Sequence, residues 1–303
     1  MNYGLPYMGS KNKIAKDIID CLPAGEVFVD LFCGGCAVTH AAMLSGKYKR
    51  FIINDTIAMM PNVFRDAIDG KFKDEKRIIS REDFERLKDT DVYARLCWSF
   101  GNNGRNYLWG KEYAGIKMLA CKMIMADDWH ERLLVYRAFI QYLQKHIELT
   151  RKMLESLQRL QRLESLQRLQ RLESLQRLQR LQRLQSLQRL QRLQSLESIQ
   201  CLEVFTGDYQ DVKIPGNAVV YCDPPYINTG GYGIDFDHER FYNWLRTRDF
   251  PVYVSEYAMP DDFVCIWRKE KTCTYSSANN KKKTVEKLFV HEKFKEAVKD
   301  ELL

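Results

Sequence analysis

The residues of this sequence that are best suited to chemistry are consecutive: Asp223, Pro224, Pro225 and Tyr226. They follow residues 219–222, an apolar run typical of a buried strand, and the prolines end that strand because they lack an N–H and fix φ. The Asp223 carboxylate and the Pro224 carbonyl are then neighbouring hydrogen-bond acceptors beside the Tyr226 ring. An exocyclic amine that donates to both acceptors loses conjugation with its ring and becomes nucleophilic, while the tyrosine stacks on the base. These residues indicate methylation of a nucleobase amino group, and an ordinary Asp-Pro turn is the alternative.

A nucleotide-binding unit that could serve this chemistry is expected near the start of the chain. Residues 27–32 are typical of a buried strand, Gly34 and Gly35 allow a sharp turn into a helix, and a second strand over 51–53 leads to Asp55. An acidic residue about 20 positions after such glycines can accept hydrogen bonds from a ribose. Because the full G-x-G-x-x-G pattern is missing, a phosphate-free adenosine cofactor fits better than a dinucleotide.

A loop over residues 6–11 ends in Lys11, just before the amphipathic pattern of residues 14–22. A loop that ends in a lysine before a helix suits an anionic or carboxylate ligand. A solvated surface lysine is the alternative.

Aromatic, asparagine and glycine residues gather in the run 97–109, which also contains one arginine. Asn and Arg pair with the edges of adenine and guanine, and aromatic rings can stack or wedge into a duplex opened for base flipping. The candidate DNA-binding residues are Asn102, Asn103, Arg105, Asn106 and Tyr107. A glycine-rich surface loop is the alternative, because Asn-Gly pairs also form turns.

Together these motifs resemble the Dam-like family of DNA N6-adenine methyltransferases, which use S-adenosylmethionine. The resemblance covers residues 3 to about 150 and 201 to about 295, and it rests on four motifs in the family's order: residues 7–11, 32–36, 55 and 223–226. It implies that the cofactor is contacted by Tyr7, Lys11, Asp55 and Asp223, that Asp30 and Gly34 line its methionine end, and that Asp208 reaches its adenine. Turn or helix-cap carboxylates are the alternatives for Asp30, Asp55 and Asp208.

Residues 154–202 form a repeat in which leucine occupies every third position, except for Ile199. Its residue types favour helix, but three steps of an α-helix leave each leucine about 60° behind the last. We expect a long, partly exposed helix whose leucines wind around it without defining one buried face. Residues 151–200 hold 11 Lys and Arg against 4 Asp and Glu, whereas the remainder holds 36 of each sign. This basic segment could contact DNA phosphates, or it could be a solvated face that keeps the leucines soluble.

The composition, with 303 residues of which 45% are hydrophobic, fits one large domain with an insertion or two domains. No apolar run approaches the length of a membrane span and the N-terminal residues lack a signal-peptide core, so we expect a protein of the cytoplasm without a membrane partner. We also expect a monomer. The nine cysteines lack framework spacing, and we expect reduced thiols and no metal.

The predicted fold class is α/β, with a Rossmann-like methyltransferase sheet, helices on both faces, a helical target-recognition insertion and a long Leu-rich repeat. The expected segments are a cofactor-binding half, a helical target-recognition insertion, a repeat spacer and a catalytic half, at residues 1–70, 71–150, 151–200 and 201–303. The predicted reaction is the transfer of a methyl group from S-adenosylmethionine to N6 of a flipped adenine in double-stranded DNA, with a restriction enzyme as a conceivable partner. Methylation of RNA adenine or of cytosine N4, and a DNA-binding or scaffolding protein built around the repeat, are the alternatives.

Overall fold

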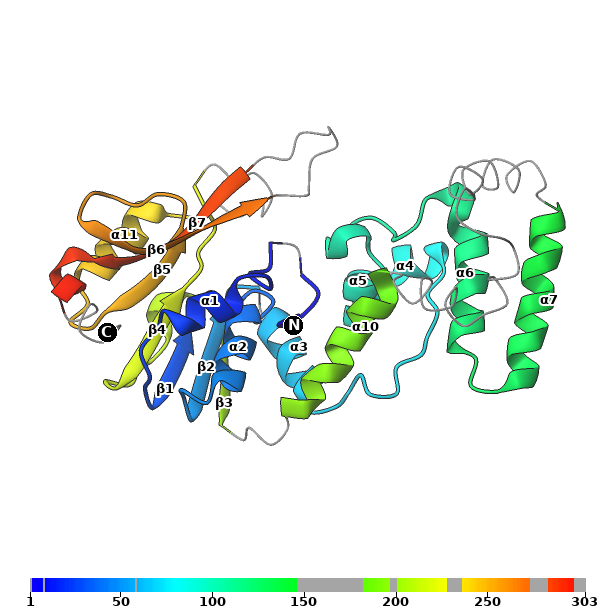
Figure 1. The fold of residues 1–303 in the computed structure, drawn as a ribbon, viewed down its shortest axis with the longest axis horizontal. Helices are drawn as coiled ribbons and strands as arrows, with labels where there is room; N and C mark the ends of the chain where they lie inside the picture. The colour runs from blue at the N-terminus through cyan, green and yellow to red at the C-terminus, as the bar shows by residue number, and fades with distance from the viewer. Residues whose placement is uncertain are drawn as a thin grey trace. The chain divides into compact units, whose positions relative to one another are not determined.

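The computed structural model divides the chain into two compact units, each of which is described by itself (Figure 1). The first unit comprises Met1–Leu5, Gly9–Gly70 and Leu193–Leu303, and the second comprises Pro6–Met8 and Lys71–Arg192. The structure describes residues 2–7, 9–57, 59–145, 182–196, 201–227, 236–272 and 283–296.

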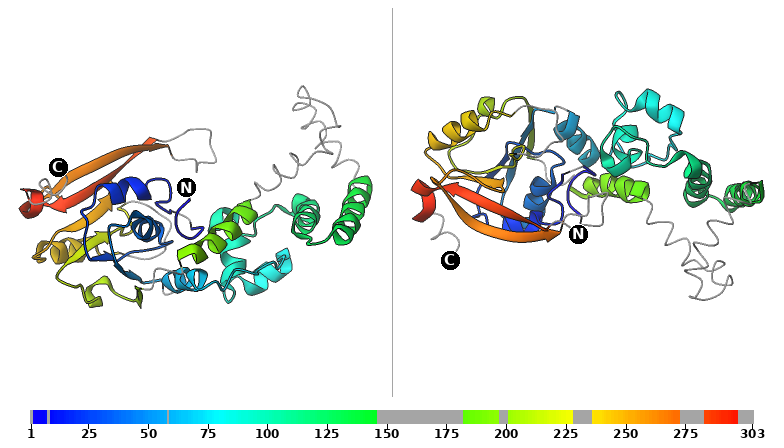
Figure 2. Two further views of the ribbon diagram at one scale, coloured as in Figure 1. Left: turned by 60° about the horizontal axis from the view of Figure 1, so that its bottom comes forward. Right: turned by 90° about the horizontal axis from the view of Figure 1, so that it is seen from above.

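The first unit is built on a seven-stranded sheet in the order β3-β2-β1-β4-β5-β7-β6. The strands are β1 (Val27–Asp30), β2 (Arg50–Asp55), β3 (Leu202–Thr206), β4 (Ala218–Cys222), β5 (Val252–Glu256), β6 (Phe263–Thr272) and β7 (Lys283–His291). The first five strands in the sheet order pair in parallel, whereas β7 pairs antiparallel with both β5 and β6. The strands β7 and β6 form one edge of the sheet (Figure 2). This mostly parallel sheet confirms the predicted Rossmann-like fold class.

The register of the central strands brings three carboxylates to one edge of the sheet. Asp30 at the end of β1 pairs with Ile53 of β2 and Tyr221 of β4. Parallel strands end on the same side, so Asp55 at the end of β2 and Asp223 just after β4 lie at that edge as well. Ligands of open α/β sheets bind at the carboxyl ends of the strands, and this edge is therefore where a site is expected.

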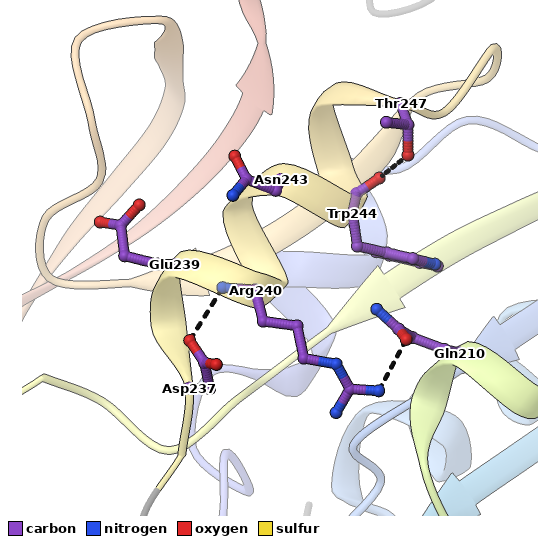
Figure 3. Close-up of a pocket in the computed structure, with 7 residues that line it drawn as sticks. All are labelled: Gln210, Asp237, Glu239, Arg240, Asn243, Trp244 and Thr247. Carbon is purple, nitrogen blue, oxygen red and sulfur yellow. Dashed lines mark hydrogen bonds between the residues drawn. The ribbon is translucent and has the colours of Figure 1, made fainter.

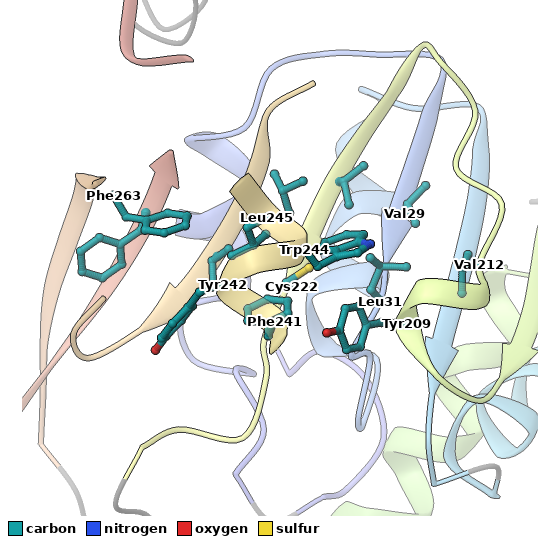
Figure 4. Close-up of a cluster of buried hydrophobic side chains, with 14 of the residues drawn as sticks. Val29, Leu31, Tyr209, Val212, Cys222, Phe241, Tyr242, Trp244, Leu245 and Phe263 are labelled. Carbon is teal, nitrogen blue, oxygen red and sulfur yellow. The ribbon is translucent and has the colours of Figure 1, made fainter. Parts of the chain in front are cut away.

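One face of the sheet is covered by α11 (His238–Arg246), whose N-cap Asp237 accepts a hydrogen bond from the Arg240 N–H at 2.9 Å. Its apolar side chains follow the i, i+3, i+4 spacing of an amphipathic helix. The cluster they form with the strands includes Val29, Leu31, Cys222, Phe241, Trp244 and Leu245 (Figure 4). This packing fixes the ends of β1 and β4 from one side.

The opposite face carries α2 (Ala37–Ser45), which packs against β1, β2 and α1 (Ala15–Asp20). Successive side chains of a strand alternate between faces, so Asp30 points away from the cluster that contains Val29. The Thr39 hydroxyl of α2 donates to the Asp30 carboxylate at 2.7 Å, which places that carboxylate on the α2 face. A further helix, α3 (Met59–Ile68), packs against β2 and β3.

The regular secondary structure of the second unit, in its described parts, is helical apart from an isolated bridge between Ser99 and Tyr107, which agrees with the expected helical insertion. Its helices are α4 (Arg81–Leu87), α5 (Val92–Cys97), the 3₁₀ turn η1 (Phe100–Asn102), α6 (Lys111–Met125), α7 (Trp129–Lys145) and most of α10 (Gln182–Leu193). Three buried aromatic rings pack together beneath the loop that follows α5: Trp98, Tyr107 and Trp109. No helix within the described ranges is long and apolar enough to cross a membrane.

The end of the leucine repeat forms α10 and a short 3₁₀ turn, η3 (Gln194–Leu196). Its leucines at 187, 190, 193 and 196 are all buried, whereas Gln188 and Arg192 are exposed. Three leucines at this spacing span only about 120° of an α-helix, which is no wider than an ordinary core-facing stripe. The expectation that the leucines define no buried face is therefore wrong for these residues, whereas the long, partly exposed helix expected for the whole repeat stays a prediction. Residues 151–181 and 197–200 of the repeat lie outside the described residues.

Candidate active site

The Asp-Pro-Pro-Tyr turn follows β4 directly, so the strand ends where the prolines predict. The Asp223 side chain is 19% exposed, and its Oδ1 atom lies 2.8 Å from Lys11 Nζ. Burial raises the pKa of Asp223, and the neighbouring Lys11 ammonium opposes that rise. The structure therefore joins a lysine assigned to the cofactor with an aspartate assigned to the reacting amine.

Glu286 completes this group, which we call the Lys11 cluster: Lys11, Asp223, Tyr226 and Glu286. The Tyr226 hydroxyl donates to Glu286 Oε2 at 3.0 Å, and Lys11 Nζ lies 3.8 Å from the same oxygen. Lys11 Nζ also stands 4.4 Å from the centroid of the Tyr226 ring. Sequence reasoning missed Glu286. Its spacing was a signal that it points inward, because Glu286, Leu288 and Val290 occupy every second position of a strand and therefore share one face.

Two contacts hold the Asp-Pro-Pro-Tyr turn in place. The Tyr226 ring meets Tyr257 edge-on, with ring centroids 4.5 Å apart. His238 Nε2 lies 2.9 Å from the Pro225 carbonyl oxygen, which ties the turn to the start of α11. These contacts restrict the rotamer of Tyr226 and favour a fixed ring face beside the carboxylate of Asp223.

Glu256 at the end of β5 is a second buried acid that sequence reasoning missed. It is 2% exposed, and its Oε1 atom accepts a hydrogen bond from the Tyr257 N–H at 2.9 Å. Burial raises the pKa of Glu256 to about 7, and the nearby Asp223 carboxylate contributes to the rise. Its place at the end of β5 resembles that of Asp30 at the end of β1 and Asp55 at the end of β2.

Asp30 is almost completely buried, at 1% exposed. Its Oδ2 atom accepts the Thr39 hydrogen bond, whereas Oδ1 has no aligned donor in the described part of the chain; the nearby Phe32 N–H lowers the pKa of the carboxyl without forming an aligned hydrogen bond. Burial raises the pKa of Asp30 to about 7, and the carboxylates of Asp223 and Asp55 add to the rise. A buried carboxylate oxygen with unused acceptor capacity fits a positively charged donor on a ligand.

Asp55 accepts two backbone hydrogen bonds, from the Gly34 N–H to Oδ2 and from the Ile57 N–H to Oδ1, each at 2.8 Å. Each oxygen keeps one lone pair, so the carboxylate can still accept two hydroxyl groups of a ligand. Burial raises the pKa of Asp55, and the two N–H groups oppose that rise. The bond from Gly34 also ties the glycine turn to the end of β2.

The N-terminal residues pack against this glycine turn, a contact that the sequence did not predict. The Leu5 N–H donates to the Gly35 carbonyl at 2.7 Å, and Gly4 has a φ of 64°. A Cβ atom at Gly4 would lie 2.3 Å from the Gly35 carbonyl oxygen, so a larger residue cannot fit without moving the backbone. Tyr7 is half-buried and groups with the second unit.

Asp208 caps the 3₁₀ turn η4 (Tyr209–Asp211) by accepting a hydrogen bond from the Gln210 N–H at 2.9 Å. Its Oδ2 atom lies 2.7 Å from Arg240 Nη1, and Arg240 also donates to the side-chain oxygen of Gln210 at 2.6 Å. A depression of about 580 Å³ lies beside these residues (Figure 3). It is lined by Gln210, Asp237, Glu239, Arg240, Asn243, Trp244 and Thr247.

The five candidate DNA-binding residues divide into two groups in the second unit. Asn102 Nδ2 donates to the Leu96 carbonyl at 2.7 Å and to Ser186 Oγ at 3.1 Å, which joins the loop to α10. Tyr107 is 5% exposed and donates its hydroxyl hydrogen to the Ile79 carbonyl at 2.9 Å. These two side chains support the loop from within.

The remaining members lie nearer the surface. Asn103 Oδ1 accepts hydrogen bonds from the backbone N–H groups of Arg105 and Asn106, which is the geometry of an Asx turn. Arg105 and Asn106 are exposed, and the neighbouring Phe100 is 59% exposed. The loop thus presents an arginine, an amide and an aromatic ring to solvent.

No group of three or more His, Cys, Asp or Glu side chains in the described ranges is arranged to hold a metal ion, and no disulfide joins the cysteines there. The fold and the acidic edge of its sheet place the protein in the class of Rossmann-like methyltransferases. A model of the D12 class N6 adenine-specific DNA methyltransferase family matches residues 7–248, and the chain belongs to that family. This confirms the resemblance seen in the sequence and makes adenine in DNA the substrate of the family's reaction. No curated protein matches the chain.

Proposed function

We propose that this protein transfers the methyl group of S-adenosylmethionine to N6 of an adenine that has been flipped out of double-stranded DNA. The observation that carries the proposal is the position of the Asp-Pro-Pro-Tyr turn, at the same sheet edge as Asp30 and Asp55. Methyl donor and acceptor can then meet at one edge, as transfer between them requires.

The acidic edge of the sheet fits the cofactor. Asp30 Oδ1 has the unused acceptor capacity that an α-amino group needs, and Asp55 keeps two lone pairs for the ribose hydroxyls. Gly34 lines the methionine end, and the proposal also assigns Tyr7, Lys11 and Asp208 to cofactor binding. When bound, S-adenosylmethionine supplies an electrophilic methyl group on a sulfonium.

Asp223 and Pro224 act on the target base. The carboxylate and the carbonyl accept the two hydrogens of the N6 amine, which draws its lone pair toward the methyl group. Tyr226 stacks on the adenine, held in place by Tyr257 and Glu286. The Asp223 carboxylate would also balance the positive charge that N6 gains as the new N–C bond forms and the S–CH3 bond of the sulfonium breaks, and the N6 proton would then pass to solvent.

The loop in the second unit contacts the DNA. Arg105 and Asn106 are exposed and carry the donors that read guanine and adenine edges, and Phe100 offers a ring that can stack in an opened duplex. Asn102, Asn103 and Tyr107 were predicted to contact DNA, and we now assign them to holding this loop. We further expect a monomer that acts in the cytoplasm, and we keep a partner restriction enzyme as a proposal.

The proposal is tested with labelled S-adenosylmethionine, double-stranded DNA and the variants Asp223→Asn and Asp223→Ala. Both variants should lose methylation of DNA while they keep the fold, because the side chain lies at a strand end and not in the core. Asp20→Asn, which changes an exposed carboxylate, is the matched control and should methylate like the wild type. Digestion of the product to nucleosides identifies N6-methyladenine. Methylcytosine instead, methylation of RNA alone, or near-normal turnover by Asp223→Asn would each refute the proposal.

A further inference from the structure

Glu286 lies on β7, beyond the residues that the family model matches. It is a buried carboxylate, with its side chain 4% exposed, in a strand that pairs antiparallel with β5. Burying a carboxylate is unfavourable unless it gains polar or charged partners, and Glu286 is buried next to the Asp-Pro-Pro-Tyr turn. This position makes Glu286 a candidate for a role in the reaction.

The same oxygen of Glu286 serves two partners. Oε2 accepts the Tyr226 hydroxyl at 3.0 Å and lies 3.8 Å from Lys11 Nζ. Lys11 Nζ is closer to Asp223, at 2.8 Å. Lys11 therefore stands between two carboxylates, one in close contact and one about 1 Å too far for a close ion pair.

The close contact with Asp223 conflicts with the proposed reaction. Lys11 draws electron density from the carboxylate that has to accept the N6 amine, and its ammonium repels the positive charge that N6 gains during transfer. Lys11 cannot simply lose its partner, because an uncompensated buried charge is strongly destabilising. A second carboxylate within about 1 Å of pairing removes this conflict, because Lys11 can move toward it without losing a counter-ion.

We infer that Glu286 is a positioning residue that takes over the ion pair of Lys11 when Asp223 accepts the target amine, while it also holds the Tyr226 ring through its hydroxyl. The inference rests on the proposed function, because the role of Asp223 in the reaction defines the moment at which Lys11 has to move. It assigns Glu286 no contact with substrate or cofactor.

The kinetic test compares Glu286→Gln with Tyr226→Phe in single-turnover methylation at saturating DNA and S-adenosylmethionine. The glutamine keeps an acceptor for the Tyr226 hydroxyl but removes the charge that holds Lys11. We expect Glu286→Gln to slow the rate at saturation by about 10- to 100-fold, in the range of a lost charge partner in a reaction centre, and to change KM for DNA less than threefold. Tyr226→Phe loses the hydroxyl alone and should slow the rate less. Glu292→Gln, on the exposed residue of the following turn, is the control.

A further variant decides the inference if Glu286→Gln folds poorly. Glu286→Asp keeps the charge at a shorter reach, and its rate should lie between those of the wild type and Glu286→Ala. A rate of Glu286→Gln above half of the wild-type rate, or a rate of Glu286→Asp equal to that of Glu286→Ala, would overturn the proposed ion-pair transfer.

A double-mutant cycle in the absence of substrates keeps this inference separate from the proposed function. Lys11→Met and Glu286→Gln are combined and their coupling is measured by urea unfolding, first in the wild type and then with Asp223→Asn, which removes the competing charge. If Lys11 moves to Glu286, the factor by which the coupling increases the folding equilibrium constant should be at least tenfold larger in the Asp223→Asn background than in the wild type. An unchanged coupling refutes the inference even if methylation is normal. An increased coupling in a protein that methylates no DNA supports the movement of Lys11 and refutes the proposed function alone.

Discussion

Replacing Asp30 with asparagine should make the protein more stable at neutral and alkaline pH while it weakens cofactor binding. The side chain is 1% exposed, and Oδ1 has no aligned donor in the described part of the chain. Asparagine has nearly the same shape, and its side-chain oxygen can still accept the Thr39 hydroxyl. The substitution therefore removes a buried charge and little else.

The expected magnitude follows from the pKa of Asp30, which burial raises from 3.8 to about 7. Because the folded pKa lies above the unfolded one, the carboxyl destabilises the fold: its cost is absent well below pH 4, grows as the pH rises and is complete above about pH 7. A difference of about three pKa units corresponds to about 4 kcal/mol at alkaline pH. Between pH 5 and pH 8 alone, the advantage of the variant should grow by about 3 kcal/mol.

The measurement is urea unfolding of the wild type and Asp30→Asn at pH 5 and pH 8, followed by tryptophan fluorescence. Asp20→Asn is the control, and its free energy of unfolding should differ little from that of the wild type at both pH values. S-adenosylmethionine at 100 times its Kd should add about 2.7 kcal/mol to the stability of the wild type and much less to that of Asp30→Asn. An advantage of Asp30→Asn that is the same at pH 5 and pH 8 would refute the reasoning, because it would show that Asp30 does not titrate in the folded protein near pH 7.

Three further predictions concern cofactor and DNA binding. Asp55→Ala should weaken the binding of S-adenosylmethionine by about 1 to 3 kcal/mol through loss of the ribose acceptors, and unchanged affinity in calorimetry would move the ribose contact elsewhere. Arg105→Ala should weaken binding to the target DNA by about 1 to 3 kcal/mol if Arg105 reads a base, and binding titrations should show a smaller loss with unrelated DNA. Deletion of residues 154–171, two nine-residue units of the repeat, should leave single-turnover methylation at saturating DNA nearly unchanged. Each phosphate contact that is lost should make the negative slope of log affinity against log salt shallower by about 0.9. An unchanged salt slope together with a lower urea midpoint of unfolding in the shortened protein would identify the repeat as a structural strut.

The strands at the centre of the sheet were predictable because both of their faces are buried. Residues 27–32 and 219–222 are nearly continuous apolar runs, which is how parallel strands covered on both sides read in a sequence. The edge strand β6 was not predicted. Its second half, from Arg268 to Thr272, is mostly charged, and an edge strand needs fewer apolar residues than a central one.

The candidate site was predictable where a residue's role depends on the strand that carries it. Asp30, Asp55 and Asp223 end or follow recognisable strands, and parallel pairing alone brings them to one edge. Glu286 was not predictable in this way, because its contact with Tyr226 depends on the antiparallel pairing of β7 with β5. The burial of Tyr107 was not predictable for another reason: residue type does not reveal which side of a loop an aromatic ring occupies, and this ring is 5% exposed.

The crowding of carboxylates at the sheet edge links the stability of the fold to its proposed chemistry. Asp30, Asp223 and Glu256 each have a raised pKa, and burial is the largest cause in each case. Repulsion from neighbouring carboxylates adds to the rise in each case, and Lys11 compensates only part of it at Asp223 and Glu256. A fold selected for stability alone would replace such residues, as the expected effect of Asp30→Asn illustrates. A cationic ligand at this edge would relieve the repulsion, so the features that destabilise the free protein are those that would favour a sulfonium cofactor.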